Sequence, residues 1–304
     1  MPEINWYPGH MAKTRRLLQD QLRAIDAVVE LCDARAPQAT RNPDLIQMTR
    51  GKAHILVLNK ADLANDNLTA QWLAYYRGKG LSAIKFNATG GKTREVLSEI
   101  ERATAPVVSR MKARGVNKTV RLMVIGIPNV GKSTFINRLF GSAIAKASDR
   151  PGVTRSNQWV KVGPYLELLD TPGMLWPRLS DPDGARCLAF LGSIRDQVID
   201  SERLSDNLLK VLLDIAPAQA EARFKLTPER IAQTECLLEA ACLGRGWLLS
   251  GGRYDTDRAS ALVLDEFRAG KVGRITLERP PKARKEESHA PRNAGSEAAP
   301  TDGD

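Results

Sequence analysis

Residues 126–133 have the spacing of a phosphate-binding loop. They read Gly-Ile-Pro-Asn-Val-Gly-Lys-Ser and match the pattern G-x-x-x-x-G-K-[ST], between an apolar run and a helical pattern. The glycines let backbone N–H groups turn around a β-phosphate, and the N-terminus of the following helix adds positive potential. Lys132 is expected to reach the β- and γ-phosphates, and Ser133 to ligate magnesium. The loop in this setting predicts nucleoside triphosphate binding.

A second motif, Asp170-Thr171-Pro172-Gly173, follows another apolar run about forty residues later. Asp170 is suited to holding the shell of a magnesium ion, and the Gly173 N–H to sensing a γ-phosphate. On its own this tetrapeptide is typical of a plain turn. Together with the phosphate-binding loop it indicates a switch segment that responds to the γ-phosphate.

A third motif, Asn59-Lys60-Ala61-Asp62, also ends an apolar run. The Asp62 carboxylate can accept hydrogen bonds from N1–H and the 2-amino group of guanine, which adenine does not offer. Asn59 is expected to bridge to the phosphate-binding loop, and the stem of Lys60 to cover the base. An isolated motif of this kind favours a surface turn, but three strand-terminal motifs that need one nucleotide favour guanine nucleotide binding.

The elements that must position these motifs alternate between apolar runs and helical patterns, which predicts an α/β fold. Short, nearly continuous apolar runs are typical of a parallel sheet covered by helices on both faces, whose ligands bind at the carboxyl ends of the strands. Strands are expected at residues 27–31, 55–58, 83–86, 120–125 and 166–169, and an amphipathic helix at 11–25.

After residue 183 the pattern becomes helical, which predicts a small all-α domain. Helices are expected at 185–191, 204–213, 228–242 and 258–269. The expected organisation is a nucleotide-binding domain at 1–182 with an N-terminal catalytic or RNA-contact segment at 1–26, a helical domain at 183–279, and a disordered tail at 280–304.

Composition indicates what kind of partner and which cellular compartment to expect. The formal net charge is +10, and the four cysteines show no metal-binding spacing. A basic chain suits a polyanionic partner, although a merely soluble basic protein has the same charge. The sequence has no apolar run of about 18 residues and no secretory signal, so a reduced, cytoplasmic protein is expected. His54 and His289 show no partner in the sequence, and no role is expected for them.

The order of the motifs resembles that of the circularly permuted P-loop GTPases. The chain runs from Asn59-Lys60-Ala61-Asp62 through Asn87-Ala88 to the phosphate-binding loop, Thr154 and the Asp170 motif. Residues 5–11, 33–37, 151–154 and 250–277 are similar to the ribosome biogenesis GTPase A family, and the resemblance covers about residues 1–279. The fold implied is a P-loop GTPase with a permuted parallel sheet and a small all-α C-terminal domain.

The resemblance implies a set of site residues. Ala88 N–H would meet the guanine carbonyl oxygen, while Asn87 departs from the usual serine. Ser133, Thr154 and Asp170 would hold Mg²⁺, and Asn129 would help to bind K⁺, unless it is only a turn residue. The residues expected to bind GTP are Asn59, Lys60, Asp62, Asn87, Ala88, Asn129, Val130, Gly131, Lys132, Ser133, Thr134 and Gly173.

His10 matches the family's catalytic histidine. Met174 stands where a Ras-like enzyme has its water-orienting glutamine, and a thioether cannot position water. His10 could therefore take that role, although a packing or capping histidine is the simpler interpretation.

The resemblance also implies a function. A monomeric GTP hydrolase would bind the precursor of the large ribosomal subunit, through ribosomal RNA and proteins, in late maturation, and would leave after hydrolysis stimulated by that subunit. Two alternatives stay open. One is an RNA-binding switch with negligible turnover, and the other is a permuted GTPase that serves a different RNA or a membrane-bound target.

Overall fold

The computed structural model describes residues 19–148, 160–163, 166–170, 181–194 and 200–281. In this part of the chain a six-stranded sheet has the order β3-β2-β1-β4-β6-β5. Five strands are parallel, and β5 pairs with β6 in the antiparallel direction. The strands are β1 (Ala27–Asp33), β2 (Ala53–Asn59), β3 (Ser82–Lys85), β4 (Val120–Gly126), β5 (Val160–Gly163) and β6 (Leu166–Asp170). The predicted fold class is confirmed, and β5 is an edge strand that the sequence patterns did not reveal.

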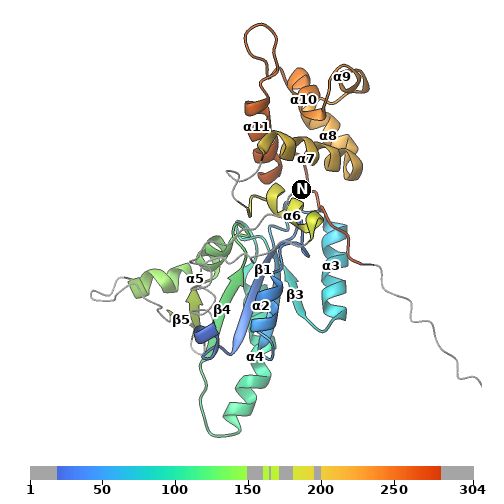
Figure 1. The fold of residues 1–304 in the computed structure, drawn as a ribbon. Helices are drawn as coiled ribbons and strands as arrows, with labels where there is room; N and C mark the ends of the chain where they lie inside the picture. The colour runs from blue at the N-terminus through green and yellow to red at the C-terminus, as the bar shows by residue number, and fades with distance from the viewer. Residues whose placement is uncertain (1–18, 149–159, 164–165, 171–180, 195–199, 282–304) are drawn as a thin grey trace, which may run out of the picture.

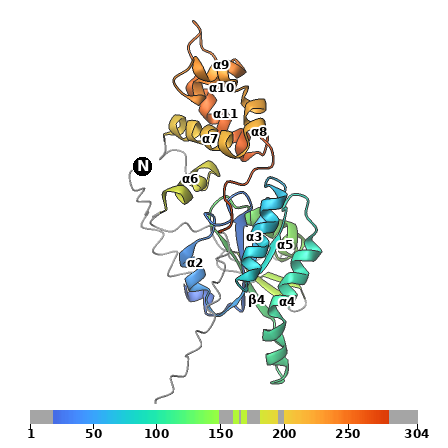
Figure 2. The ribbon, with the colours of Figure 1, turned by 90° about the vertical axis from the view of Figure 1, so that its right-hand side faces the viewer.

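Helices cover both faces of the sheet, which explains why the strands are apolar along their whole length. On one face Leu56 and Leu58 of β2 pack with Trp72 of α3 (Asp66–Gly78). On the other face Ile55 and Val57 pack in one cluster with residues of α4 (Thr93–Lys112) and α5 (Lys132–Ser148). The short helix α2 (Pro43–Met48) lies on the side opposite α4 (Figure 2).

One strand residue breaks the apolar pattern. Glu30, in the middle of β1, is buried and forms an ion pair with Arg41 at 2.7 Å and a hydrogen bond with His54 at 2.8 Å. Burial raises the pKa of the Glu30 carboxyl, but the hydrogen bonds from His54 and Arg41 outweigh burial and hold that pKa below its usual value. The expectation that His54 lacks a partner was wrong, because β1 and β2 pair in a register that sets the two side chains on one face.

Beyond the sheet the described chain is helical. The helices are α6 (Pro182–Phe190), α7 (Ser201–Ile215), α8 (Pro217–Phe224), α9 (Pro228–Ala232), α10 (Leu237–Arg245) and α11 (Thr256–Arg268). The single helix expected at 228–242 is two helices, because side chains bond to the backbone between them. The Thr234 hydroxyl lies within hydrogen-bonding distance of the carbonyls of Arg230 and Cys236. The Glu239 carboxylate accepts from the N–H of Glu235. Helix α8, with Pro217 at its start, was not expected.

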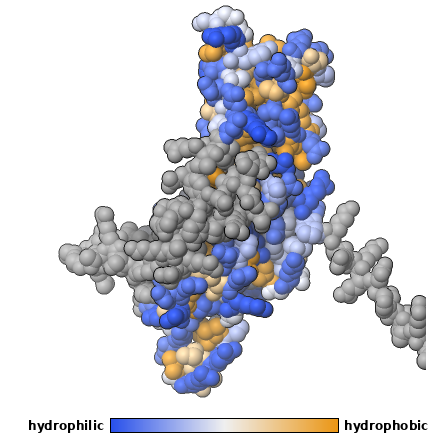
Figure 3. Space-filling model, in the orientation of Figure 1, coloured by the Kyte–Doolittle hydropathy of each residue, from blue (hydrophilic) through white to orange (hydrophobic). Residues whose placement is uncertain are grey.

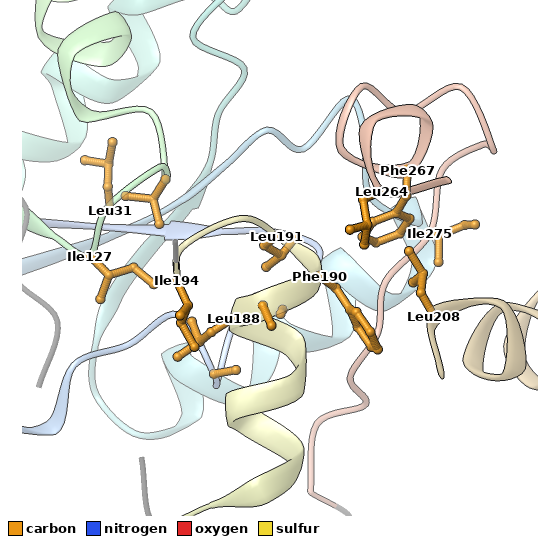
Figure 4. Packing of buried hydrophobic residues seen from close by; sticks show 14 of the residues in the cluster. Leu31, Ile127, Leu188, Phe190, Leu191, Ile194, Leu208, Leu264, Phe267 and Ile275 are labelled. Atoms are coloured by element: carbon orange, nitrogen blue, oxygen red, sulfur yellow. The ribbon is translucent and has the colours of Figure 1, made fainter. Parts of the chain in front are cut away.

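Helices α7–α11, which we call the helical unit, gather at one end of the sheet, with α6 between them and the strands (Figure 1). Leu188 and Ile194 lie between Leu31 and Ile127 on the sheet side and the residues of the helical unit (Figure 4). One hydrophobic cluster therefore runs across residue 183, and the domain limits expected from the sequence stay predictions.

Hydrophilic residues cover most of the coloured surface in Figure 3, with hydrophobic residues between them. No helix in the described ranges is both long enough and apolar enough to span a bilayer.

Candidate nucleotide site

The sheet brings the sequence motifs to one edge. Strand β2 ends at Asn59 opposite Asp33 of β1, and β4 ends at Gly126 opposite Leu31 of β1. Asp170 ends β6 opposite Val124 of β4. Since these strands are parallel, their carboxyl ends share the edge where open α/β sheets bind ligands.

Asn59 joins three of the loops at this edge. Its amide nitrogen donates to the carbonyl of Val130 in the phosphate-binding loop at 2.8 Å, and its amide oxygen accepts from the N–H of Ala88 at 3.2 Å. The side chain is buried, so each of these bonds is protected from water. The Ala88 N–H that the resemblance assigned to guanine is therefore engaged by Asn59 in this structure.

The phosphate-binding loop is built closely around this amide. Gly131 has φ +91°, and a Cβ there would lie 2.6 Å from Nδ2 of Asn59, so only glycine fits. Lys132 reaches back over the loop and donates to the carbonyl of Ile127 at 2.8 Å. Ser133 and Thr134 follow at the exposed start of α5. The loop thus has a turned backbone with a cation across it, which suits a chain of phosphates.

A cluster of charged side chains around the buried Asp33 contacts the phosphate-binding loop. The Asp33 carboxylate contacts the guanidinium of Arg35 at 2.8 Å and the ammonium of Lys60 at 3.0 Å. Burial raises the pKa of the Asp33 carboxyl, but the charges of Arg35 and Lys60 prevail and bring it to about 2. Lys60 also donates to the carbonyl of Asn129 at 2.6 Å, so the ion cluster reaches the phosphate-binding loop.

A pocket of about 260 Å³ opens beside Asp62. The residues that line it include Asp62, Lys85, Phe86, Asn87, Lys92 and Arg274. The Asn87 side chain accepts from the N–H of Thr89 at 2.8 Å and from its hydroxyl at 2.6 Å. Asn87 therefore closes a local turn in this structure, and Arg274, from the C-terminal end of the described chain, is a wall residue that no local pattern suggested.

The segment after α6 contacts the phosphate-binding loop. The Asn129 side-chain amide donates to the carbonyl of Gly192, and the Ser193 hydroxyl donates to the carbonyl of Pro128 at 3.0 Å. Asn129 has φ +63°, which fits the turn residue considered from the sequence. This contact was not expected, because nothing in the local sequence of Gly192-Ser193 marks it as a neighbour of the loop.

Several predicted site residues are not placed. His10, Thr154 and Gly173 lie outside the described residues. Asp170 is placed by its backbone at the end of β6. Within the described ranges no cluster of three or more His, Cys, Asp or Glu side chains suited to a metal is present.

Comparison with known proteins supports the GTPase fold. A family model described as "50S ribosome-binding GTPase" matches residues 121–234. The match begins just before the phosphate-binding loop and leaves Asn59–Asp62 outside, as a permuted motif order requires. The structure is also similar to GNP-bound YlqF from Thermotoga maritima, with a TM-score of 0.63, 27% identity, and coverage of 88% of this chain and 98% of that chain.

Sequence relatives cover nearly the whole chain. Ribosome biogenesis GTPase A from Priestia megaterium is 43% identical over 92% of this chain and 98% of the relative. The protein of the same name from Thermotoga maritima is 32% identical over 91% of this chain and 95% of the relative.

The buried ion cluster predicts the effect of Asp33→Asn. This change should lower the free energy of unfolding at neutral pH by about 3–5 kcal/mol, because it leaves the Arg35 guanidinium buried without its counter-charge. The pKa of Asp33 is lower in the folded state than its usual value of 3.8. The ionised carboxylate therefore stabilises the fold above pH 3.8, and this stabilisation is lost as the pH falls toward 2.

Urea unfolding of the wild type and the variant at a series of pH values measures both effects. The Asp33→Asn profile should be flatter than the wild-type profile in the acid range. Asp214→Asn, at an exposed position of α7, is the matched control and should leave stability unchanged. Equal stability of Asp33→Asn and the control would contradict the role of the cluster.

Proposed function

The chain belongs to the ribosome biogenesis GTPase A family, and we propose that it binds the maturing large ribosomal subunit, promotes a late assembly step and is released after it hydrolyses GTP. The observation that carries the proposal is the meeting of the phosphate-binding loop, the Asn59–Asp62 motif and Ala88 around the Asn59 amide. The formal net charge of +10 supports a partner rich in phosphate. On this proposal the protein works as a monomer in the cytoplasm, on ribosomal RNA and proteins.

The chain's own residues divide the work on GTP. Asp62 would read guanine from the wall of the pocket, and Lys132 would hold the phosphates across the turned backbone of the loop. Ser133, Thr154 and Asp170 offer the oxygen ligands that Mg²⁺ prefers, and Ser133 is exposed at the start of α5. When bound, the ion would offset the negative charge on the β- and γ-phosphates.

Base specificity gives the first test of the site. Asp62→Asn should lose GTP affinity and gain affinity for xanthosine triphosphate, because an amide offers a donor where xanthine has a carbonyl. Equilibrium binding of GTP, xanthosine triphosphate and ATP to the wild type and the variant measures this switch. Asp265→Asn, at an exposed position of α11, serves as the control. Equal binding of ATP and GTP by the wild type would contradict the assignment.

Potassium dependence tests the proposed role of Asn129. With K⁺ held beside the phosphates by the side-chain amide oxygen of Asn129, turnover should be severalfold faster in potassium than in sodium salts. The donated bond from the Asn129 amide to Gly192 would orient that oxygen. Steady-state hydrolysis at equal ionic strength is the measurement, and Asn129→Ala should remove the difference. Identical wild-type rates in both salts would rule the role out.

Binding to ribosomal particles tests the proposed function directly. The full chain is co-sedimented with large-subunit particles in GDP, in GTP and in a non-hydrolysable GTP analogue. Retention should be greatest with the analogue and least with GDP, because release follows hydrolysis. Retention on membranes or on unrelated RNA instead would favour the alternative targets.

His10 is proposed to act in hydrolysis rather than in nucleotide binding. The reason lies in the sequence, where Met174 replaces a water-orienting glutamine and His10 stands in the segment that resembles the family's catalytic element. His10→Ala should keep GTP affinity and particle binding but lose most of the stimulated turnover, since such assistance can be worth ~10³–10⁵ in rate. The variant should also stay longer on the particle.

Turnover in the presence of large-subunit particles measures this prediction, and His289→Ala in the C-terminal tail is the control. A wild-type rate for His10→Ala would make His10 structural. Negligible turnover of the wild type with particles would favour the RNA-binding switch.

A further inference from the structure

After α11 the chain returns to the sheet and runs along the loop that carries Asp62. The N–H of Ile275 donates to the carbonyl of Leu63 at 3.1 Å, and the hydroxyl oxygen of Thr276 accepts from the N–H of Asn65 at 3.0 Å. Ile275 and Thr276 are both buried. We call residues 274–278 the return segment. Its contacts fix the backbone just after the Asn59–Asp62 motif, which we call the base-recognition motif.

The return segment is itself anchored at its far end. The N–H of Leu277 donates to the carbonyl of Arg35 at 2.7 Å, and the Trp72 indole donates to the carbonyl of Glu278 at 3.2 Å. The Glu278 carboxylate accepts from the N–H groups of Gln38 and Ala39 at 2.7 and 3.0 Å. The segment is therefore a fixed support for the Asp62 loop and not a loose end.

Arg274 makes the contact nearest to the base pocket. Its Nε donates to the backbone carbonyl of Asp62 at 3.0 Å, and its guanidinium also pairs with Asp66. The same side chain lines the pocket together with Asp62 and Asn87. One guanidinium thus holds the residue that would read guanine and the start of the next helix.

The exposure of the Arg274 side chain helps to decide whether it stabilises the fold or positions Asp62. Arg274 and Asp66 are 55% and 54% exposed, and ion pairs this open to water contribute little to stability. A structural role would therefore be weak. The bond from Arg274 to the Asp62 carbonyl is exposed as well, but it is made to the residue whose carboxylate must be placed closely enough for two simultaneous hydrogen bonds to a base.

We propose that Arg274 is a specificity-determining positioning residue, through which the return segment holds Asp62 in place for guanine. The inference rests on the proposed binding of guanine nucleotides at this pocket. It makes base recognition depend on a segment that lies beyond the helical unit in sequence. By linkage, guanine binding and the docking of the return segment must then strengthen each other equally.

The test compares two nucleotides that differ only in the group Asp62 would read. Inosine diphosphate lacks the 2-amino group of GDP, so it can donate only one hydrogen bond to the Asp62 carboxylate. The dissociation constants of both are measured by calorimetry on the full chain, for the wild type and for Arg274→Ala. GDP affinity should fall about fivefold in the variant, the equivalent of one ordinary hydrogen bond, and inosine diphosphate affinity should fall less. The preference for GDP should therefore shrink.

Two further variants sharpen the result. Lys271→Ala removes an exposed cation just before the return segment and should leave both dissociation constants unchanged. Thr276→Val keeps the side-chain shape but removes the acceptor for Asn65, so it should also reduce the preference for GDP.

The outcomes distinguish this inference from the proposed function. A wild-type preference for GDP in Arg274→Ala overturns the positioning role. An equal loss for both nucleotides, with a lower melting temperature, makes the role structural and also overturns it. If the wild type binds neither nucleotide, the proposed function itself fails.

Discussion

One buried carboxylate holds the ends of the site together. Asp33 accepts both from Arg35, whose guanidinium also donates to the carbonyls of Phe267 and Arg268 at the end of α11, and from Lys60, which reaches the phosphate-binding loop at Asn129. A buried carboxylate is costly unless it is paired, so these partners must stay in place for the strand ends to stay folded. The helical unit, the Asn59–Asp62 motif and the phosphate-binding loop are therefore all connected to the Asp33 carboxylate through Arg35 and Lys60.

The position of Asp33 follows from the order of the strands. The strand order places β2, which leads into Asn59–Asp62, on one side of β1 and β4, which leads into the phosphate-binding loop, on the other side. Asp33 then lies at the centre of the sheet, between the strand that ends in Asn59 and the strand that leads into Gly126. The next described elements after β6 are α6 and the helices of the helical unit.

The sequence revealed the features that depend on local pattern, and missed those that depend on distant partners. Residues 126–133 and the apolar strands could be predicted, because a phosphate-binding turn needs glycine at fixed positions and a doubly covered strand is apolar throughout. The strand Val160–Gly163 is short and lies at an edge, so it has no such pattern. The pairing of Glu30 with His54 depends on strand register, and the contact of Arg274 with Asp62 joins residues 212 positions apart. No periodicity encodes either of them.

The two segments that flank the helical unit in sequence touch the candidate site on two sides. On the phosphate side, Gly192 and Ser193 accept from and donate to the phosphate-binding loop, and Arg268 of α11 donates to the carbonyl of Phe190 at 3.0 Å just before them. On the base side, Arg274 and Ile275 hold the loop after Asp62. Each side combines buried and exposed residues: Ile275 and Thr276 are buried next to the exposed Arg274, and Ser193 is buried next to the exposed Asn129. An exposed hydrogen bond exchanges with water at little net cost, while a buried one does not. The buried contacts on both sides, together with Leu188 and Ile194 in the core cluster, therefore hold the segments that flank the helical unit against the site.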